Sequence, residues 1–407
     1  MDTIVRHTYL NHLAKSLDRG MMLFLIGQRR VGKSFLLRQL RQWIEANIEH
    51  SQVLYINLEN VAYADILSYR EFCEYVESKL QPGIRTYLLI DEVQNIANYE
   101  LALRSLYADD KCQIVATGSN AYVFASELST HLSGRYIEIP VYALTYQEFL
   151  TFHNLEDNDA SLLSYLQVGG LPGLRNFNIS DQQQVAEYLQ GVYSTVLLKD
   201  VISRNNIRNM NFMQRLVHFL ADNVGKIISP ASIHKFMKSQ GVKISEVVVA
   251  DYIQYVCKAL IIKDVPRYNI HGKHIFETLE KYYFSDHGIR NAICGFDIRN
   301  SIEKIIENVV YNHLLANGYD VTVGILKNGE VDFVANKSMP GGSQSRIYVQ
   351  CCYLLSSQDT IDREFGNLVA VKDNYPKYVV TMEPVDGDLA SYPGITHINL
   401  RHFLTAL

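Results

Sequence analysis

Several features that would place a chain in a special class are missing from this sequence. No apolar run approaches the length of a membrane span, so we expect no transmembrane helix. The first residues lack an apolar segment followed by a small-residue cleavage site, which predicts no secretory signal and a cytoplasmic location. The six cysteines include no CxxC pair, and this favours reduced thiols over disulfides or zinc ligands. We also find no internal repeat and no low-complexity linker.

The length of the chain and the distribution of its charge limit the number of domains and the kinds of partner to expect. A chain of 407 residues is too long for one ordinary core and predicts two or three domains. The net charge is -5, yet residues 201–275 hold eleven Lys and Arg against four Asp and Glu. Two explanations of this basic segment stay open: a surface that binds nucleic acid, or a solvated surface that docks on an acidic neighbouring domain.

The first 152 residues predict an α/β domain. Apolar runs of strand length alternate with helical patterns, which is typical of a mostly parallel sheet covered on both faces. The expected strands are residues 22–26, 53–58, 86–93, 112–119 and 135–140.

The rest of the chain predicts three further segments. Residues 153–228 read as a mostly helical linker or lid. Residues 229–285 predict two helices, 230–239 and 245–259, joined by a turn at Gly241 and followed by two strands, the order of a winged helix. Residues 286–407 predict a smaller α/β domain, in which a helix ending near Gly318 precedes three sequential antiparallel strands.

The stretch "GQRRVGKS", residues 27–34, follows the first strand and opens a helix. This context and spacing predict a phosphate-binding loop. Gly27 and Gly32 let backbone N–H groups turn towards a phosphate, Lys33 can reach the β and γ phosphates, and the Ser34 hydroxyl can ligate Mg²⁺. The expected nucleotide contacts are Gly27, Gln28, Arg29, Arg30, Val31, Gly32, Lys33, Ser34 and Phe35.

Acids at the end of another strand complete the predicted nucleotide site. In "YLLIDE", Asp91 is expected to hold Mg²⁺ through water, and Glu92 to orient and deprotonate the attacking water. A site that only binds nucleotide has no use for Glu92, so its presence favours hydrolysis.

Two more elements can reach the γ-phosphate. "TGSN" ends the next strand and offers Thr117, Ser119 and Asn120, although a simple turn would explain it equally well. "LSGR" offers Arg135, which can stabilise charge developing on the γ-phosphate, in cis or from a neighbouring subunit; a structural ion pair is the alternative.

Taken together, these motifs resemble the AAA-type P-loop ATPases of prokaryotes, close to the archaeal-ATPase and STAND side of that superfamily. The resemblance extends over nearly the whole chain, through "ALTYQEFL", "YLQVGGLPG", "KYYFSDHGIRN" and "GEVDFVA". It implies an ATPase core, a winged-helix segment and a C-terminal domain with a restriction-endonuclease-like core, with ATP and Mg²⁺ as cofactors.

Nucleases with that core need a Glu on a helix, an Asp on a strand, and Glu-x-Lys on the next strand. Glu307 and Asp332 fit the first two places, but Gln350, Cys351 and Cys352 stand where Glu-x-Lys is required. The sequence therefore predicts a degenerate core. Glu330 is a possible relocated ligand for which the sequence gives no further argument.

The favoured hypothesis is an ATPase that couples Mg-ATP binding and hydrolysis to movement of C-terminal domains that can bind DNA through residues 201–275. The alternatives are a nucleotide-switched DNA-binding regulator with slow turnover and an ATP-dependent nuclease. A homo-oligomer is possible, and we expect no membrane partner. His271, His274, His397 and His402 have no Cys or acid at ligand spacing and are expected to be surface or core residues.

Overall fold

The computed structural model describes residues 4–119, 132, 134–270, 272, 274–339, 341–384 and 387–406, with the backbone alone at 274–278. The chain divides into two compact units. Unit 1 comprises Met1–Tyr142 and Lys258–Leu260, and unit 2 comprises Ala143–Cys257 and Ile261–Leu407. In the part of the chain that is described, no helix has the length and apolarity needed to cross a bilayer.

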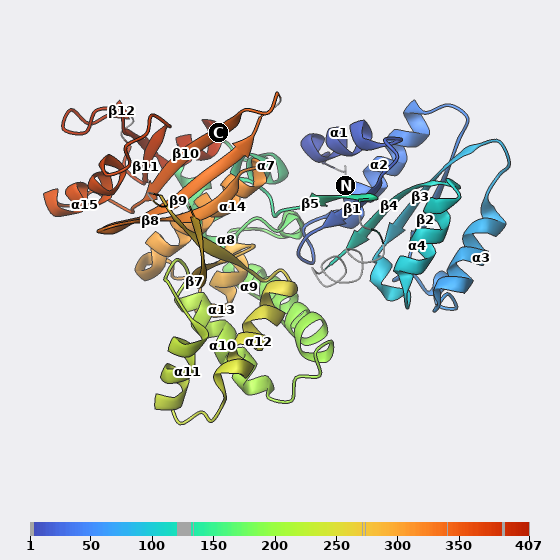
Figure 1. Cartoon of the computed structure of the whole chain (residues 1–407), viewed down its shortest axis with the longest axis horizontal. Helices are drawn as coiled ribbons and strands as arrows, with labels where there is room; N and C mark the ends of the chain where they lie inside the picture. Colours follow the sequence, from blue (N-terminus) through green and yellow to red (C-terminus); the bar gives the residue numbers. More distant parts are fainter. Residues whose placement is uncertain are drawn as a thin grey trace. The chain divides into compact units, whose positions relative to one another are not determined.

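Unit 1 is built on a parallel sheet of five strands in the order β2-β3-β4-β1-β5 (Figure 1). Its strands are β1 (Met22–Ile26), β2 (Ser51–Asn57), β3 (Arg85–Asp91), β4 (Gln113–Gly118) and β5 (Tyr136–Pro140). Its described helices are α1 (His7–Ser16), α2 (Lys33–Asn47), α3 (Tyr69–Lys79) and α4 (Tyr99–Ala108). The predicted parallel α/β sheet is confirmed, and each strand starts and ends within two residues of the prediction.

Helices cover both faces of this sheet. Phe72 of α3 and Leu103 of α4 join a core with alternate strand residues such as Phe24 and Leu88. Helix α2 packs against β2, β3 and β4, and its own buried stripe includes Leu36 and Leu40. Because all five strands run in one direction, the segments that follow β1, β3 and β4 emerge at the same edge of the sheet.

Unit 2 contains helices followed by a mixed sheet of eight strands in the order β12-β13-β11-β10-β9-β8-β6-β7. Its helices are α7 (Tyr146–His153), α8 (Asp159–Val168), α9 (Gln182–Thr195), a π-helix (Val196–Ser203), α10 (Met210–Asp222), α11 (Pro230–Ser239), α12 (Glu246–Lys258), α13 (His287–Cys294), α14 (Ile302–Ala316), α15 (Gln358–Val369) and α16 (Leu400–Ala406). Its strands are β6 (Ile262–Asn269), β7 (His274–Phe284), β8 (Asp320–Leu326), β9 (Gly329–Ser338), β10 (Gln344–Cys351), β11 (Lys377–Thr381), β12 (Gly387–Asp388) and β13 (Thr396–Asn399). Strands β8, β9 and β10 are antiparallel neighbours, as the sequence predicts.

The hairpin β6–β7 differs from its predicted role as a wing. Arg267, Tyr268 and Asn269 of β6 pair in parallel with Val323, Gly324 and Ile325 of β8. This pairing makes the hairpin one end of the C-terminal sheet, so the predicted boundary between residues 285 and 286 separates two neighbouring parts of one sheet. Short-range patterns show that two strands form a hairpin but not which third strand they join.

Within unit 2, Asp286 joins two segments far apart in sequence. Its side chain is 1% exposed, accepts a hydrogen bond from the N–H of Ile289 (3.0 Å) as N-cap of α13, and accepts another from the N–H of Gly170 (2.8 Å). Burial raises the pKa of Asp286, while the neighbouring His287 lowers it. The "GGLPG" turn is thereby held to the start of α13.

Replacing Asp286 by Ala would leave the buried N–H of Gly170 without a partner and remove the cap of α13. We expect a loss of about 2–4 kcal/mol in the free energy of unfolding, measured by urea denaturation. Asp181→Ala is the matched control, because Asp181 caps the exposed start of α9 through Gln184 alone. Its expected cost is about 1 kcal/mol, and equal costs for the two variants would contradict the assigned role of Asp286.

Candidate nucleotide-binding site

The loop between β1 and α2 has the backbone that a phosphate-binding loop requires. Gly32 has φ of 99° at the N-cap of α2, a left-handed conformation that favours glycine. A Cβ at Gly27 would lie 2.2 Å from the carbonyl oxygen of Val141, so only glycine fits there. Val31 is buried and anchors the loop at the N-terminus of α2, and a helix N-terminus is where phosphates bind.

Lys33 lies across this loop and is 4% exposed. Its Nζ donates to the carbonyl oxygens of Gly27 (2.7 Å) and Gln28 (3.0 Å). The ammonium group is therefore inside the loop, where the predicted phosphates would lie. Gln28 is also buried, and its Oε1 has no hydrogen-bond partner.

Asp91, the last residue of β3, lies beside the loop and is 2% exposed. Its Oδ1 accepts hydrogen bonds from the hydroxyls of Ser34 (3.0 Å) and Thr117 (2.7 Å). Its Oδ2 accepts one from the Tyr55 hydroxyl (3.2 Å) of β2. Burial raises the pKa of Tyr55, so this hydroxyl stays protonated and donates. The structure thus brings together the two residues, Ser34 and Asp91, that the sequence assigns to a metal.

Glu92 follows in a left-handed conformation with φ of 59°. Its N–H donates to the Thr117 hydroxyl (2.9 Å), and its carboxylate accepts a hydrogen bond from the Gln94 amide. The same amide donates to the Ser119 hydroxyl (3.2 Å) at the end of β4. Glu92 is therefore held by Thr117 of β4 and by Gln94, in the 3-10 turn that follows β3, instead of extending into solvent.

Three other residues predicted to contact the nucleotide, Arg29, Arg30 and Phe35, are at least partly exposed at the surface. Phe35 is 57% exposed, Arg30 is exposed, and Arg29 forms an ion pair of 3.7 Å with Glu59. Asn120 is outside the described residues.

The prediction that Arg135 can reach the γ-phosphate in cis is wrong. Its carbonyl accepts from the N–H of Met22, at the start of β1, and its guanidinium lies over the Tyr107 ring. The loop begins after Ile26, at the other end of β1, about 13 Å away along the strand.

Sequence reasoning missed three residues that support the site. Gln94 and Tyr55 are described above. Arg6 is 5% exposed, and its guanidinium donates to the carbonyl oxygens of Val31 (3.2 Å) and Tyr142 (3.0 Å). The apolar spacing around Arg6 gave no signal of this contact, because its partners are backbone carbonyls.

Comparison with known proteins agrees with this geometry. Residues 19–150 match the AAA domain family, and residues 159–300 match a domain of unknown function, DUF8612. An uncharacterized protein of Haemophilus influenzae is 31% identical over 93% of both chains. This chain belongs to the same family as that protein, and its first unit is a AAA-type P-loop domain.

Two more distant matches complete the comparison. An uncharacterized protein of Methanocaldococcus jannaschii is 27% identical over 84% of this chain and 79% of its own length. Among solved structures, that of the Aeropyrum pernix ORC1 protein in complex with DNA is 14% identical and covers 72% of this chain and 93% of that one, with a TM-score of 0.33. A likeness this low carries no argument about function.

A second group of charged residues lies in unit 2, where the sequence predicts a degenerate nuclease core. The ammonium of Lys281, on β7, contacts the carboxylates of Glu307 (2.9 Å), Glu330 (2.6 Å) and Asp332 (3.4 Å). Burial alone would lower the pKa of Lys281, but these three carboxylates raise it above its usual value. The Tyr283 hydroxyl donates to Glu307 at 2.5 Å. We call these five residues the Lys281 cluster.

The segment that lacks Glu-x-Lys lies against this cluster. Gln350 accepts from the N–H of Asp332 (3.2 Å) and donates to Glu364 (2.7 Å), and the N–H of Cys351 donates to the Asp332 carboxylate (2.9 Å). Sequence reasoning missed Lys281, which is 51 residues from Asp332 in sequence. The ammonium group of Lys281 lies between the three carboxylates that the sequence analysis named as possible metal ligands. This arrangement favours a structural role for the cluster over metal binding.

The histidines differ in their surroundings. His397 is 2% exposed and lies 2.8 Å from the Thr381 hydroxyl, as expected for a core histidine, and His402 is exposed. His271 and the side chain of His274 are outside the described residues.

Replacing Lys281 by Met would leave three carboxylates close together without their cation. We expect a loss of about 3–5 kcal/mol in the free energy of unfolding at neutral pH, measured by urea denaturation. Lys327→Met, at an exposed turn of the same sheet, should change it by less than about 0.5 kcal/mol.

A second substitution separates charge from packing. If the loss comes from uncompensated charge, adding Glu307→Gln and Glu330→Gln to Lys281→Met should recover part of the stability. A triple variant no more stable than Lys281→Met would show that packing, and not charge, explains the loss.

Proposed function

We propose that this protein binds Mg-ATP at the loop between β1 and α2 and hydrolyses it. The observation that carries this proposal is the hydrogen bond between Ser34 and Asp91 at 3.0 Å, next to a Lys33 ammonium held inside the loop. A hydroxyl and a carboxylate in contact form the hard oxygen pair that Mg²⁺ prefers. The match of residues 19–150 to the AAA domain family supports the same site.

Each residue has a distinct task in this proposal. The N–H groups of residues 27–34 and the N-terminus of α2 bind the phosphates, and Lys33 exchanges its bonds to Gly27 and Gln28 for phosphate oxygens. Ser34 and Asp91 hold Mg²⁺, which when bound neutralises charge on the β and γ phosphates. The buried Oε1 of Gln28 can accept a hydrogen bond from a donor that enters the loop.

Hydrolysis needs a base close to the attacking water, and we assign this task to Glu92. The carboxylate is next to Asp91 in sequence and is oriented by Gln94, which also contacts Ser119. Glu92 would accept a proton from water, while Ser119 and Thr117 keep the end of β4 in contact with the site. Arg135 can contribute only from a neighbouring copy of the chain.

Two substitutions separate binding from turnover. Lys33→Ala should abolish ATP binding, measured with a fluorescent ATP analogue, because it removes the cation that contacts the phosphates. Glu92→Gln should bind ATP with near wild-type affinity but release phosphate about 100- to 10,000-fold more slowly, because the amide cannot accept the proton.

Glu45→Gln is the control for Glu92→Gln, because Glu45 is an exposed residue of α2 that pairs with Arg41 at the surface. It should leave both binding and turnover unchanged. Turnover at the wild-type rate in Glu92→Gln would exclude Glu92 as the base, and ATP binding by Lys33→Ala would exclude the loop as the binding site.

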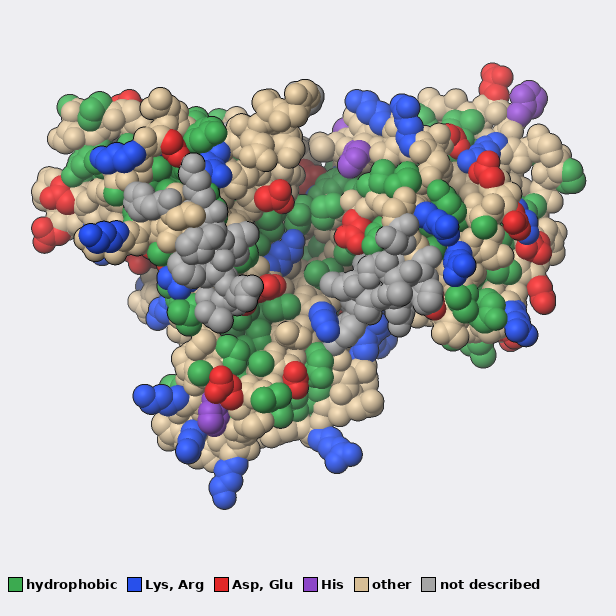
Figure 2. All heavy atoms as spheres, in the orientation of Figure 1, with side chains coloured by type: hydrophobic (Ala, Val, Ile, Leu, Met, Phe, Trp, Pro, Cys, Tyr) green, Lys and Arg blue, Asp and Glu red, His purple; other side chains and the backbone are tan. Residues whose placement is uncertain are grey.

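A second part of the proposal is that unit 2 contacts the backbone of DNA and couples this contact to ATP turnover. Lys and Arg side chains project from the helices α10–α12 and the segments beside them (Figure 2). The exposed ones are Arg204, Arg208, Arg215, Lys226, Lys235, Lys238 and Lys243. Lys263 is half-buried and not part of this exposed group, and burial lowers its pKa to about 8. The exposed acids Glu246 and Asp251 on α12 disfavour base reading by that helix.

Duplex DNA, single-stranded DNA and RNA added in turn should therefore stimulate ATP turnover through a salt-sensitive interaction. Nucleic-acid binding should weaken steeply as the salt concentration rises. In a plot of the logarithm of affinity against the logarithm of salt concentration, the slope should become about one unit less steep for each phosphate contact removed. Lys235→Ala with Lys238→Ala should reduce the slope, whereas Lys327→Ala, outside this surface, should not. Turnover and binding that respond to no nucleic acid would refute the coupling and leave the ATPase assignment intact.

A further inference from the structure

The end of α10 in unit 2 carries two donor groups that no part of the nucleotide site uses. His218 and Asp222 lie one helical turn apart, and the His218 Nδ1 is 3.3 Å from an Asp222 carboxylate oxygen. Cys294, the last residue of α13, brings a thiol to the same place, beside the Asp222 carboxylate. One donor atom from each of the three residues lies within 4.8 Å of the other two.

The chemistry of these donors selects a class of metal ion. Imidazole nitrogen, thiolate sulfur and carboxylate oxygen together are ligands of Zn²⁺, at bond lengths of about 2.0–2.3 Å. Mg²⁺ and Ca²⁺ require oxygen ligands and would not select this group. Three protein ligands leave the fourth position of a tetrahedral ion for water or another donor.

The helices that carry the donors are fixed relative to one another. The carbonyl oxygen of Ala221 accepts a hydrogen bond from the buried Arg290 of α13 (3.0 Å), and that of Asp222 accepts one from Lys304 of α14 (2.7 Å). The end of α10 is therefore held in place by contacts that do not involve the donor atoms. A metal ion would need side-chain adjustments but no movement of the helices.

The surrounding charges are compatible with a bound dication. Burial raises the pKa of Cys294 to about 12, Arg290 and Lys304 act to lower it, and Asp222 acts to raise it. A thiolate and a carboxylate would balance the two charges of the ion and leave the site neutral. A Zn²⁺ ion that displaces the thiol proton would change the charge of these three residues from -1, that of Asp222, to zero, so Arg290 and Lys304 would not face a net positive charge.

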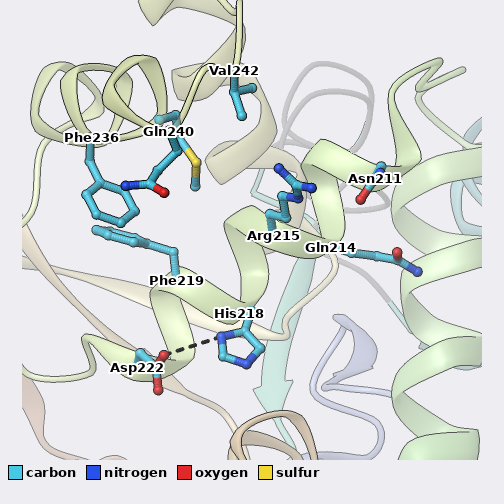
Figure 3. A pocket seen from close by; sticks show the side chains of 10 residues that line it. Asn211, Gln214, Arg215, His218, Phe219, Asp222, Phe236, Gln240 and Val242 are labelled. Carbon is cyan, nitrogen blue, oxygen red and sulfur yellow. Dashed lines mark ion pairs between the residues drawn. The ribbon is translucent and has the colours of Figure 1, made fainter.

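A pocket of about 490 Å³ adjoins these residues (Figure 3). His218 and Asp222 lie at one end of the pocket. On another side, the rings of Phe219 and Phe236 pack together with their centroids 5.1 Å apart. Arg215 projects into the same region. A metal ion between His218 and Asp222 would have this space beside it for water or a small anionic ligand.

We propose that His218, Asp222 and Cys294 form a Zn²⁺ site that links α10 to α13 beside this pocket. The proposal is independent of the ATPase assignment, because its residues take no part in the loop, Asp91 or Glu92. A surface ion pair between His218 and Asp222 with a nearby thiol is the alternative, and it predicts no metal affinity.

The test uses the full-length chain, freed of metal with a chelator and kept reduced and without nucleotide, titrated with Co²⁺ as a spectroscopic probe. One equivalent of Co²⁺ should produce a thiolate-to-metal absorption band and the visible bands of a tetrahedral ion, and Zn²⁺ should displace both. Cys294→Ser should lose the thiolate band. His218→Ala and Asp222→Asn should weaken binding by more than about 100-fold, because loss of even an outer partner of a metal ligand costs about 10- to 100-fold.

Cys73→Ser and His234→Ala are matched controls, since each removes a half-buried Cys or His away from the three donors. Both should bind Co²⁺ like the unmodified chain. A far-ultraviolet circular dichroism spectrum and a urea midpoint like those of the unmodified chain verify that each variant is folded, and Zn²⁺ should raise the melting temperature of the unmodified chain but not that of Cys294→Ser. The absence of a thiolate band in the unmodified chain, or its persistence in Cys294→Ser, would overturn the proposal.

Discussion

The hydrogen bonds of Asp91 join α2, β2 and β4 to the end of β3 at the candidate nucleotide site. Three hydroxyls, from Ser34 of α2, Thr117 of β4 and Tyr55 of β2, converge on one carboxylate that is 2% exposed. A buried carboxylate without such partners is costly, so the strand ends and the first turn of α2 have little freedom to move apart. The N–H of Glu92 bonds to Thr117, the same hydroxyl that reaches Asp91, and the position of Glu92 therefore depends on the same set of contacts.

The sequence predicted this part of the chain well, because its information is local. The glycine spacing of the loop and the burial of each strand depend on neighbouring residues, and a parallel sheet then places the ends of β1, β3 and β4 together. The same rule explains the error at Arg135, which precedes β5 and so lies at the opposite end of the sheet from the loop. Arg6 and Gln94 went unnoticed because a backbone carbonyl or a short polar contact leaves no periodic trace in a sequence.

Predictions for unit 2 were weaker, because they depend on which distant segments meet. The order of helices and the antiparallel β8–β9–β10 set followed from local patterns, whereas the pairing of β6 with β8 did not. Lys281 shows the same limit, since it meets Asp332 across 51 residues of sequence. Likewise, Asp222 and Cys294 meet through the packing of α10 on α13, although the cysteine spacing had argued against metal ligands.

The acidic groups of the two units differ in whether another side chain of the protein neutralises their charge. The described partners of the Asp91 carboxylate are neutral hydroxyls, so its negative charge remains available to a cation bound with phosphate. In the Lys281 cluster, by contrast, the chain supplies its own cation, and a divalent ion would have to displace a buried ammonium from three carboxylates. The two groups of acids thus differ in what they can bind, and the residue types of their partners decide the difference. This contrast supports the proposal that unit 1, and not the Lys281 cluster, binds Mg²⁺ together with phosphate.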